Sequence, residues 1–240
     1  LTKINPTFAQ NFQVMKKIIL CTIFIVTVIF GFSQSTDKTN QNNFSSVIDV
    51  FNDIYLNVPD SVKERFFNPG ISFSGFFEHH FKNSNFSVAI GAGIGSHNFY
   101  SNSFVVTDTN GITGLRPIKN IYPNNSYKKN KISYTYLDFP VEVRMRAKND
   151  IRAAIGFKVG VLLDSHSKYK GDDYLSGTKK SLFIKTKDIN DIEKLRYGVS
   201  ARFGWKFINV TGFYSLSNLF AKDLGPELYP ISFGISLMPF

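Results

Sequence analysis

The chain has 240 residues, a formal net charge of +10, a single cysteine and an aromatic content of 15%, with 25 phenylalanines and 11 tyrosines. After Phe30 no run approaches the ~20 apolar residues of a transmembrane helix, which excludes helical membrane proteins, and the many aromatic residues favour strands. No basic helix or aromatic nucleic-acid motif accompanies the positive charge, so we expect no nucleic-acid partner.

The N-terminus has the features of an export signal. Met15 is followed by two lysines, by an apolar run that ends at Phe30, and by small residues up to Ser33. This order is typical of a cleaved secretory signal peptide, here 15–33, and the apolar run is too short for a stable membrane anchor. Cys21 lies within it, so the mature chain is expected to have no disulfide, no reactive thiol and no cysteine-bound metal.

Two further segments precede the predicted domain. We expect residues 1–14, which come before Met15, to be an upstream misannotation. Residues 34–44 are polar and are expected to be a flexible lead-in. The remaining residues, 45–240, suit a single domain, and β-barrels routinely have this length.

The first predicted elements differ in how clearly they are defined. Residues 45–58 (SSVIDVFNDIYLNV) alternate as a strand does, but the spacing of their valines and isoleucines also suits a short helix. Both interpretations therefore stay open. Residues 70–78 and 86–96 alternate more regularly and predict two strands joined by the polar link 79–85.

The clearest pair of strands spans 131–163. Leu137, Phe139 and Val141 share one face with further apolar residues, while polar and charged residues occupy the other face. The alternation resumes after the tight polar turn 148–150, which predicts a long antiparallel hairpin. The charged face points either to water or into the interior of a closed barrel.

Three more strands follow toward the C-terminus, and the lengths of the connections form a pattern. The strands are 195–207, 208–219 and 231–240, and the long polar loops are 59–69, 97–130, 164–190 and 219–230. The long loops all fall at one end of the strands and the short turns at the other. Outer-membrane barrels sort their connections in this way, whereas soluble sandwiches have Greek-key links.

The pattern predicts an all-β fold: a single antiparallel up-and-down transmembrane β-barrel of about eight strands, with short periplasmic turns and long external loops, in the outer membrane. The alternative is a soluble β-sandwich or lipocalin-like barrel, whose apolar face would be inside. An eight-stranded barrel has room only for side chains, and buried charges must be matched. The residues expected to pair in the interior are Asp138, Glu142, Arg144, Arg146, Arg152, Lys158, Arg196 and Arg202.

Four stretches carry a family resemblance: YLDFPVEVRMR (136–146), IRAAIGFKVGVLLDS (151–165), GFYSLSNLF (212–220) and ISFGISLMPF (231–240). They resemble the outer-membrane β-barrel family of Bacteroidota, of the PorT-like kind, and the first is similar to that family's Tyr-Leu-Glu-Ile-Pro strand. The third departs from the family's Tyr-x-x-Gly-Leu ending at Ser217 and Asn218, and the fourth is out of phase with its terminal aromatic Phe240. The resemblance implies a barrel from about Ser45 onward but no particular activity.

The histidines are the main candidates for chemistry, and none predicts an active site. His97 lies in GSHNFYSNS near several serines, but the His-x-Ser order of lipid A deacylases and an evident acid are missing, so an ordinary loop histidine is expected. His79 and His80 are adjacent on a predicted turn and point apart, which makes them poor chelators. We therefore expect no catalytic residue, no cofactor and no metal.

Two predicted loops are rich in cations. They could hold outer-membrane lipid or lipopolysaccharide, or an envelope or secretion protein, although a merely solvated loop explains the composition equally well. The candidate contacts are Arg116, Lys119, Lys128, Lys129, Lys168 and Lys170.

The absence of a catalytic constellation favours a non-enzymatic, monomeric barrel with a structural or accessory role in the envelope, related to secretion. A small porin or transport channel is the first alternative, although a narrow, charge-filled interior disfavours it. A lipid-modifying barrel enzyme is the second.

Overall fold

The computed structural model describes residues 44–238. The predicted signal peptide, the segment before it, nearly all of the lead-in and the terminal Phe240 lie outside these residues. Within them no helix is long and apolar enough to span a membrane.

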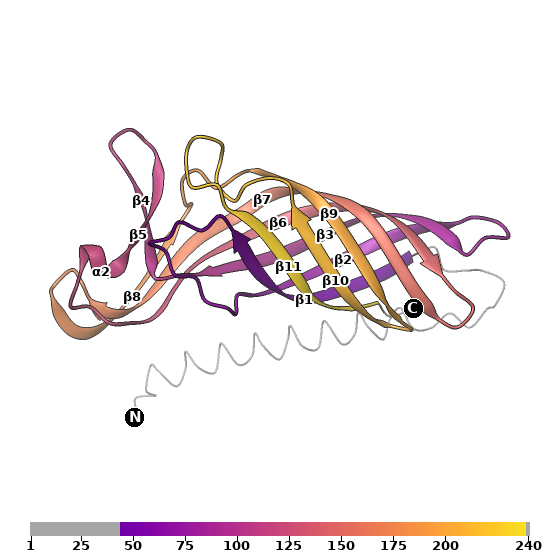
Figure 1. Cartoon of the computed structure of the whole chain (residues 1–240), viewed down its shortest axis with the longest axis horizontal. Coiled ribbons are helices and arrows are strands. Elements are labelled where there is room, and N and C mark those ends of the chain that lie inside the picture. Colours follow the sequence, from indigo (N-terminus) through magenta and orange to yellow (C-terminus); the bar gives the residue numbers. More distant parts are fainter. Residues whose placement is uncertain (1–43, 239–240) are drawn as a thin grey trace, which may run out of the picture. The chain divides into compact units, whose positions relative to one another are not determined.

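Eight strands form a closed ring of antiparallel pairs. The order is β6-β3-β2-β1-β11-β10-β9-β7, and the pairing of β6 with β7 closes it (Figure 1). Every strand of the ring thus has a hydrogen-bonded neighbour on both sides, as a bilayer requires. The ring strands are β1 (Phe44–Leu56), β2 (Pro69–His80), β3 (Phe86–Tyr100), β6 (Tyr127–Arg146), β7 (Ile151–Asp173), β9 (Leu195–Trp205), β10 (Ile208–Ser215) and β11 (Tyr229–Leu237). The predicted barrel of about eight strands is confirmed.

The segment left open between strand and helix is a strand. β1 pairs with β2 on one side and with β11 on the other, so its backbone groups are satisfied across the ring rather than within a helix. Asp49 and Asp53 are buried, while Val50 and Ile54 are 54% and 41% exposed. This alternation with a period of two excludes the helical interpretation of 45–58.

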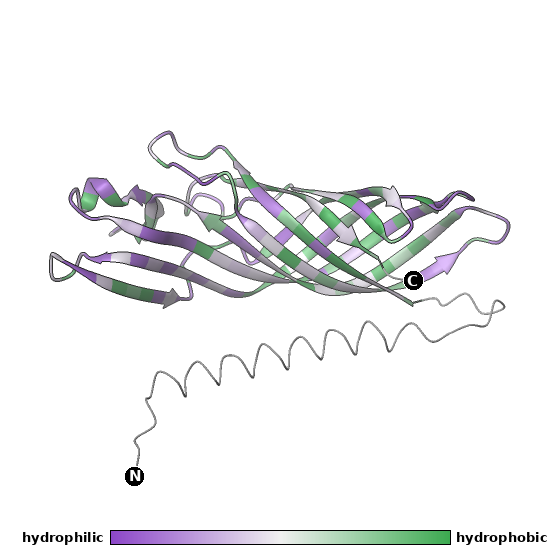
Figure 2. Cartoon of the chain, turned by 90° about the horizontal axis from the view of Figure 1, so that it is seen from below, coloured by the Kyte–Doolittle hydropathy of each residue, from purple (hydrophilic) through white to green (hydrophobic). Residues whose placement is uncertain are grey.

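The apolar face of the strands points outward around the ring. Ile155 is 67% exposed and Phe203 is 62% exposed, and neighbouring strands carry similar side chains at matching positions. Figure 2 shows the alternation of hydrophobic and hydrophilic residues along the strands. A soluble protein does not leave an apolar surface of this extent in water, so this outward face is the lipid-facing belt. The soluble sandwich and lipocalin-like alternatives are therefore wrong.

The short connections share one end of the ring. They comprise residues 81–85, 147–150 and 206–207, and each contains a non-glycine residue with positive φ: Asn83, Asp150 and Lys206. Asn and Asp tolerate this left-handed conformation, which tight turns need. His79 and His80, predicted on a turn, instead form the last two residues of β2.

The other end differs from the prediction, because the two longest loops contain ordered strands. Segment 97–130 includes the end of β3, the hairpin of β4 (Ser103–Thr107) and β5 (Thr113–Pro117), the short helix α2 (Ile118–Ile121) and the start of β6. In segment 164–190, β7 continues to Asp173 and β8 (Thr178–Lys187) pairs back on it. Above the belt neither face needs to be apolar, so the alternation that marks a strand disappears from the sequence.

These extensions form a second region, which we call the external sheet: residues 127–135 of β6, residues 164–173 of β7, and β8. β9 pairs with β7 only as far as Val161, and beyond that point β8 takes its place along β7. Figure 1 shows the external sheet reaching past the ring at the end where β4, β5 and α2 lie.

Candidate functional site

The barrel interior holds two layers of buried charge. In the layer nearer the short turns, Arg202 pairs with Glu142 and, at 2.9 Å, with Asp49. Arg144 pairs with Glu142 at 2.9 Å and with Glu78 at 2.8 Å, so five charged side chains from four strands form one chain of contacts. Arg144 also stacks 4.2 Å from the ring centroid of buried Phe76. Because each charge has an opposite partner, the layer is tolerated in a water-poor interior.

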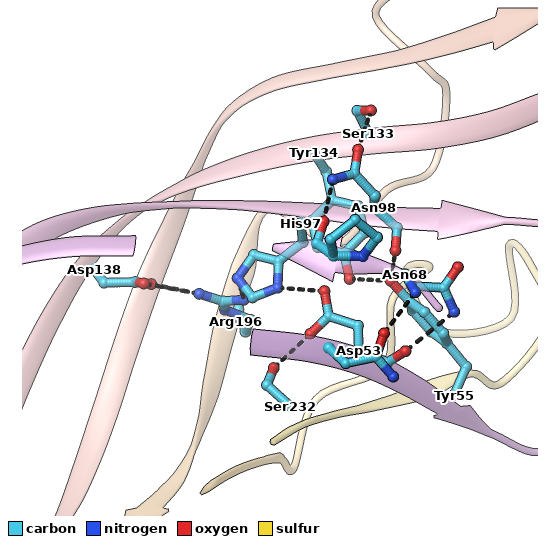
Figure 3. Close-up of polar contacts among 12 residues, drawn as sticks. Asp53, Tyr55, Asn68, His97, Asn98, Ser133, Tyr134, Asp138, Arg196 and Ser232 are labelled. Atoms are coloured by element: carbon cyan, nitrogen blue, oxygen red, sulfur yellow. Dashed lines mark hydrogen bonds and ion pairs between the residues drawn. The ribbon is translucent and has the colours of Figure 1, made fainter. Parts of the chain in front are cut away.

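The second layer lies nearer the long-loop end and is centred on Arg196 (Figure 3). One of its terminal nitrogens donates to both oxygens of Asp138 at 2.8 and 2.9 Å, and the other lies 2.6 Å from Nε2 of His97. Nδ1 of His97 lies 2.9 Å from Asp53, which also accepts from Ser232. A guanidinium can only donate, so Nε2 is the acceptor and the neutral imidazole donates from Nδ1 to Asp53.

An aromatic and aliphatic cluster closes the barrel above this layer. Tyr134 stacks on His97 with ring centroids 5.3 Å apart, and its hydroxyl lies 2.9 Å from that of Tyr55. Phe99 and Phe220 are buried in the same cluster. The long-loop end of the interior is therefore filled with packed side chains.

Two glycines provide the room that the charged side chains occupy. A Cβ on Gly160 would meet the carboxylate of Asp138, and one on Gly156 would meet Glu142 and the backbone of Val141. Glycine at these inward positions therefore lets the strands carry long side chains opposite them.

The structure places the eight predicted interior residues in three different environments. Asp138, Glu142, Arg144, Arg196 and Arg202 are buried, and Lys158 reaches Asp138 at 3.7 Å. Arg152 is half-buried near the short-turn end. Arg146 is not an interior residue, because its side chain is 54% exposed and pairs with Asp150 of the adjoining turn at 3.3 Å. Its strand leaves the barrel at that point, and the inward face opens to solvent.

Sequence reasoning missed four members of the network: Asp49, Asp53, Glu78 and His97. The two aspartates share their face with Phe51 and Tyr55, so a firm strand assignment for 45–58 would have placed them inside. His97 was expected in a loop and is instead a buried residue of β3. β3 continues to Tyr100, into the polar stretch where apolar and polar residues no longer alternate.

His97 has an acid partner but lacks the arrangement of a catalytic base. Its Nε2, which would accept a proton from a nucleophile, is occupied by Arg196. The chemistry of a Ser–His–acid triad needs a hydroxyl at that nitrogen. Among residues 44–238, no three His, Cys, Asp or Glu side chains gather as a metal site requires.

The predicted cationic loop contacts lie at the long-loop end of the ring, but in strands or in α2 rather than in loops. Lys128 and Lys129 belong to β6, Lys168 and Lys170 to β7, and Lys119 to α2. Arg116 is an exposed residue of β5. The loop assignment was therefore wrong for all six residues.

A hollow of about 430 Å³ lies between the β4–β5 hairpin and the inner face of the external sheet. Its walls include Phe104, Tyr122, Tyr169 and Tyr174, whose rings pack against one another with centroids 4.8 to 6.4 Å apart. Arg116 contributes a cation to the same walls.

Lys131 is the most perturbed cation of the external sheet. Burial, together with the neighbouring ammonium groups of Lys129 and Lys168, lowers its pKa to about 8. The pKa of Lys168 is lowered for the same kind of reason, with burial first and then Lys185 and Lys129. Positive charge is thus crowded on this surface and costs free energy.

The closed ring, the outward apolar belt and the filled interior agree with one comparison. The family described as outer membrane protein beta-barrel domain matches residues 8–221. The chain belongs to this family. The match covers the ring strands through β10, and β11 closes the ring just beyond it. No curated protein matches the chain.

Membership places this outer-membrane β-barrel protein in the outer membrane, as the sequence predicts. In such barrels the short turns are periplasmic and the longer connections are external. The external sheet and the hollow therefore face the outside of the cell, and both described chain ends, Phe44 and Met238, adjoin the periplasmic end.

Proposed function

We propose that this protein is a non-enzymatic, non-conducting barrel with a structural or accessory role in the envelope. The observation that carries the proposal is the closed interior. Two layers of matched charge and an aromatic cluster fill the ring, and the cavity that Asp49, His97 and Arg202 help to line has about 20 Å³, about enough for one water. Such an interior supports neither a substrate site nor a continuous channel.

With the interior closed, the surface available for contacts is the external region, which comprises the external sheet, β4, β5 and α2. Nearly half of β6 and nearly half of β7 extend past the belt, and β8 exists only there. Strands above the bilayer are not needed to close a barrel. Their presence supports contact with something outside the ring, and we propose an envelope or secretion protein as that partner. The resemblance to PorT-like barrels supports the same role.

The absence of conduction is tested directly in planar bilayers. Purified protein inserted from detergent is expected to give no steady current, since Arg196 and its partners block the ring. Steady current from correctly folded protein, shown by heat-modifiable migration on gels, would exclude this function and favour the porin.

The partner is tested by photo-crosslinking in native membranes. A crosslinker at Tyr122 or Leu175 in the external region is expected to give a discrete protein adduct. The matched control is Val141 on the lipid-facing belt, which should give lipid adducts alone. Protein adducts at equal yield from both places would mean that the external region is not the docking surface.

A further inference from the structure

A cross-strand row of lysines runs over the outward face of the external sheet. Lys131 of β6 lies directly opposite Lys168 of β7, which in turn lies opposite Lys185 of β8. We call these three residues the lysine row. Lys129 and Lys170 form a further opposed pair one step farther from the belt. Like charges directly opposite each other destabilise a sheet, so the row is costly unless it binds something.

No carboxylate of the described residues forms an ion pair within 4 Å with the row, and the attraction of Asp164 for Lys168 is outweighed by burial and by the neighbouring lysines. Among residues 44–238, Lys158 in the barrel interior is the only lysine with an ion pair within 4 Å. On the same face of β7, Asp164 lies 2.7 Å from His166, and Asp172 accepts a hydrogen bond from the backbone of Ser126. These acids are therefore already engaged with other groups.

Aromatic contacts gather still more cations beside the row. Lys131, Lys129 and Arg65 lie 5.3, 5.7 and 5.4 Å from the ring centroid of Tyr100 on β3. Cation–π contacts of this kind attract each cation weakly but leave its charge in place. The fold therefore holds the cations of this surface close together, and they keep their charge.

The row is continuous with the lipid-facing belt. Leu137, Val161 and Leu195 are cross-strand neighbours at the outer edge of the belt. Lys131 lies on the same face as Leu137, six residues farther along β6, which at about 3.3 Å per residue and a tilt of about 40° is roughly 15 Å above it. Lysine stems can bend several ångströms back toward the membrane. The ammonium groups thus reach the level of sugar headgroups of a glycolipid, above that of phospholipid phosphates.

Protection of an open sheet edge does not explain the row. β8 has an unpaired outer edge, and lysines on such a strand discourage pairing with another chain. Lys131 and Lys168, however, lie on strands paired on both sides at these positions, where no edge needs protection. Their placement needs a separate cause.

We propose that the lysine row binds phosphate groups on the headgroup sugars of lipopolysaccharide in the outer leaflet. Ammonium groups are flexible, strongly charged donors that suit phosphate oxygens arriving from a mobile lipid. A bound phosphate removes the repulsion between Lys131 and Lys168 and fixes the external sheet against the membrane surface. The inference rests on the proposed external, non-conducting role.

The test is a titration of the full, detergent-solubilised protein with phosphorylated lipopolysaccharide. The triple variant Lys131→Gln, Lys168→Gln, Lys185→Gln is expected to bind at least about tenfold more weakly than the unchanged protein. The matched control replaces three exposed lysines of the same region, Lys179→Gln, Lys180→Gln and Lys222→Gln, and should stay within about twofold. Heat-modifiable migration and circular dichroism establish that both variants are folded.

Further arms identify the source of the phosphate. Dephosphorylated lipopolysaccharide is expected to bind as weakly to the unchanged protein as the phosphorylated form binds to the row variant. Equal weakening in the control variant, or no weakening in the row variant, would overturn the proposal. Displacement by millimolar inorganic phosphate would overturn the lipid assignment in favour of a free-anion site. None of these outcomes changes the bilayer current, so a failure here is distinguishable from a failure of the proposed function.

Discussion

The barrel interior and the external sheet treat positive charge in opposite ways. Inside the ring, Arg196 and Arg202 are buried and each contacts a carboxylate. On the external sheet, Lys131 and Lys168 face each other with no carboxylate partner among the described residues. The interior charges are paired with opposite charges within the molecule, so their role is structural, whereas the external charges need an outside anion.

This difference explains why the net charge of +10 does not come from the barrel interior. The interior network mixes acids and bases from many strands, so it adds little to the balance. Residues 1–43 contribute +3 of this charge, and among the described residues the external sheet carries nine lysines against three aspartates. A charge excess with a defined location is evidence about what the surface meets.

Breaking one interior pair is expected to have the largest effect. Arg196→Met leaves Asp138 and His97 buried without their main partner, and should lower the free energy of unfolding by about 3–5 kcal/mol. Urea unfolding of protein in lipid vesicles measures it. The matched control is Arg146→Met, whose exposed pair with Asp150 is worth about 0–1 kcal/mol. Similar losses in both variants would mean that burial does not separate the two environments.

A charge on the lipid-facing belt is expected to have the next largest effect. Val141 lies midway along the belt-facing part of β6, between Leu137 and Met145, so Val141→Arg should cost about 2–4 kcal/mol. Leu175→Arg, at a 72% exposed position in the β7–β8 turn, should be close to neutral. The same unfolding assay compares the two variants. An unchanged free energy of unfolding in Val141→Arg would mean that the membrane boundary is assigned wrongly on β6.

Binding of phosphorylated lipopolysaccharide is expected to weaken as the pH rises through about 8. Lys131 is charged below its lowered pKa and loses its proton above it. The groups that face it are Lys129 on its own strand, Lys168 on β7, Arg65, and Asn98 and Tyr100 on β3. Titrations between pH 7 and 10 measure the change, and Lys131→Arg, which keeps its charge, should flatten it. An identical decline in that variant would remove Lys131 from the site.

Stability without phosphorylated lipid is expected to change in the opposite direction. The pKa of Lys131 is about 8 in the folded protein, below the ordinary 10.5, so the unfolded chain binds more protons between these values. Stability should therefore rise slightly with pH across that window. Unfolding in neutral lipid, with Lys131→Gln as the control that loses the slope, tests the sign.

The sequence predicts the belt and several of the buried charged residues for a simple reason. On strands such as β6, lipid on one side and a narrow interior on the other impose an alternation with a period of two. It does not predict the external sheet, because strands with two polar faces have no such alternation. His97 was missed because β3 passes there from the membrane belt, where polar and apolar residues alternate, into the part above the belt, where they do not. Arg146 was predicted inside because the alternation of polar and apolar residues continues past the end of the barrel.

The central claim is that interior cations are structural and the lysine row is not. The most direct measurement is the unfolding free energy of Lys168→Gln and of Arg196→Met in vesicles with and without phosphorylated lipopolysaccharide. Lys168→Gln should equal or exceed the unchanged protein in neutral lipid, since it removes a repulsion, and should lose most of the stabilisation that the lipopolysaccharide gives. Arg196→Met should be destabilised by the same amount in both. A Lys168→Gln variant that is destabilised in neutral lipid, or that keeps the full stabilisation from lipopolysaccharide, would contradict the account.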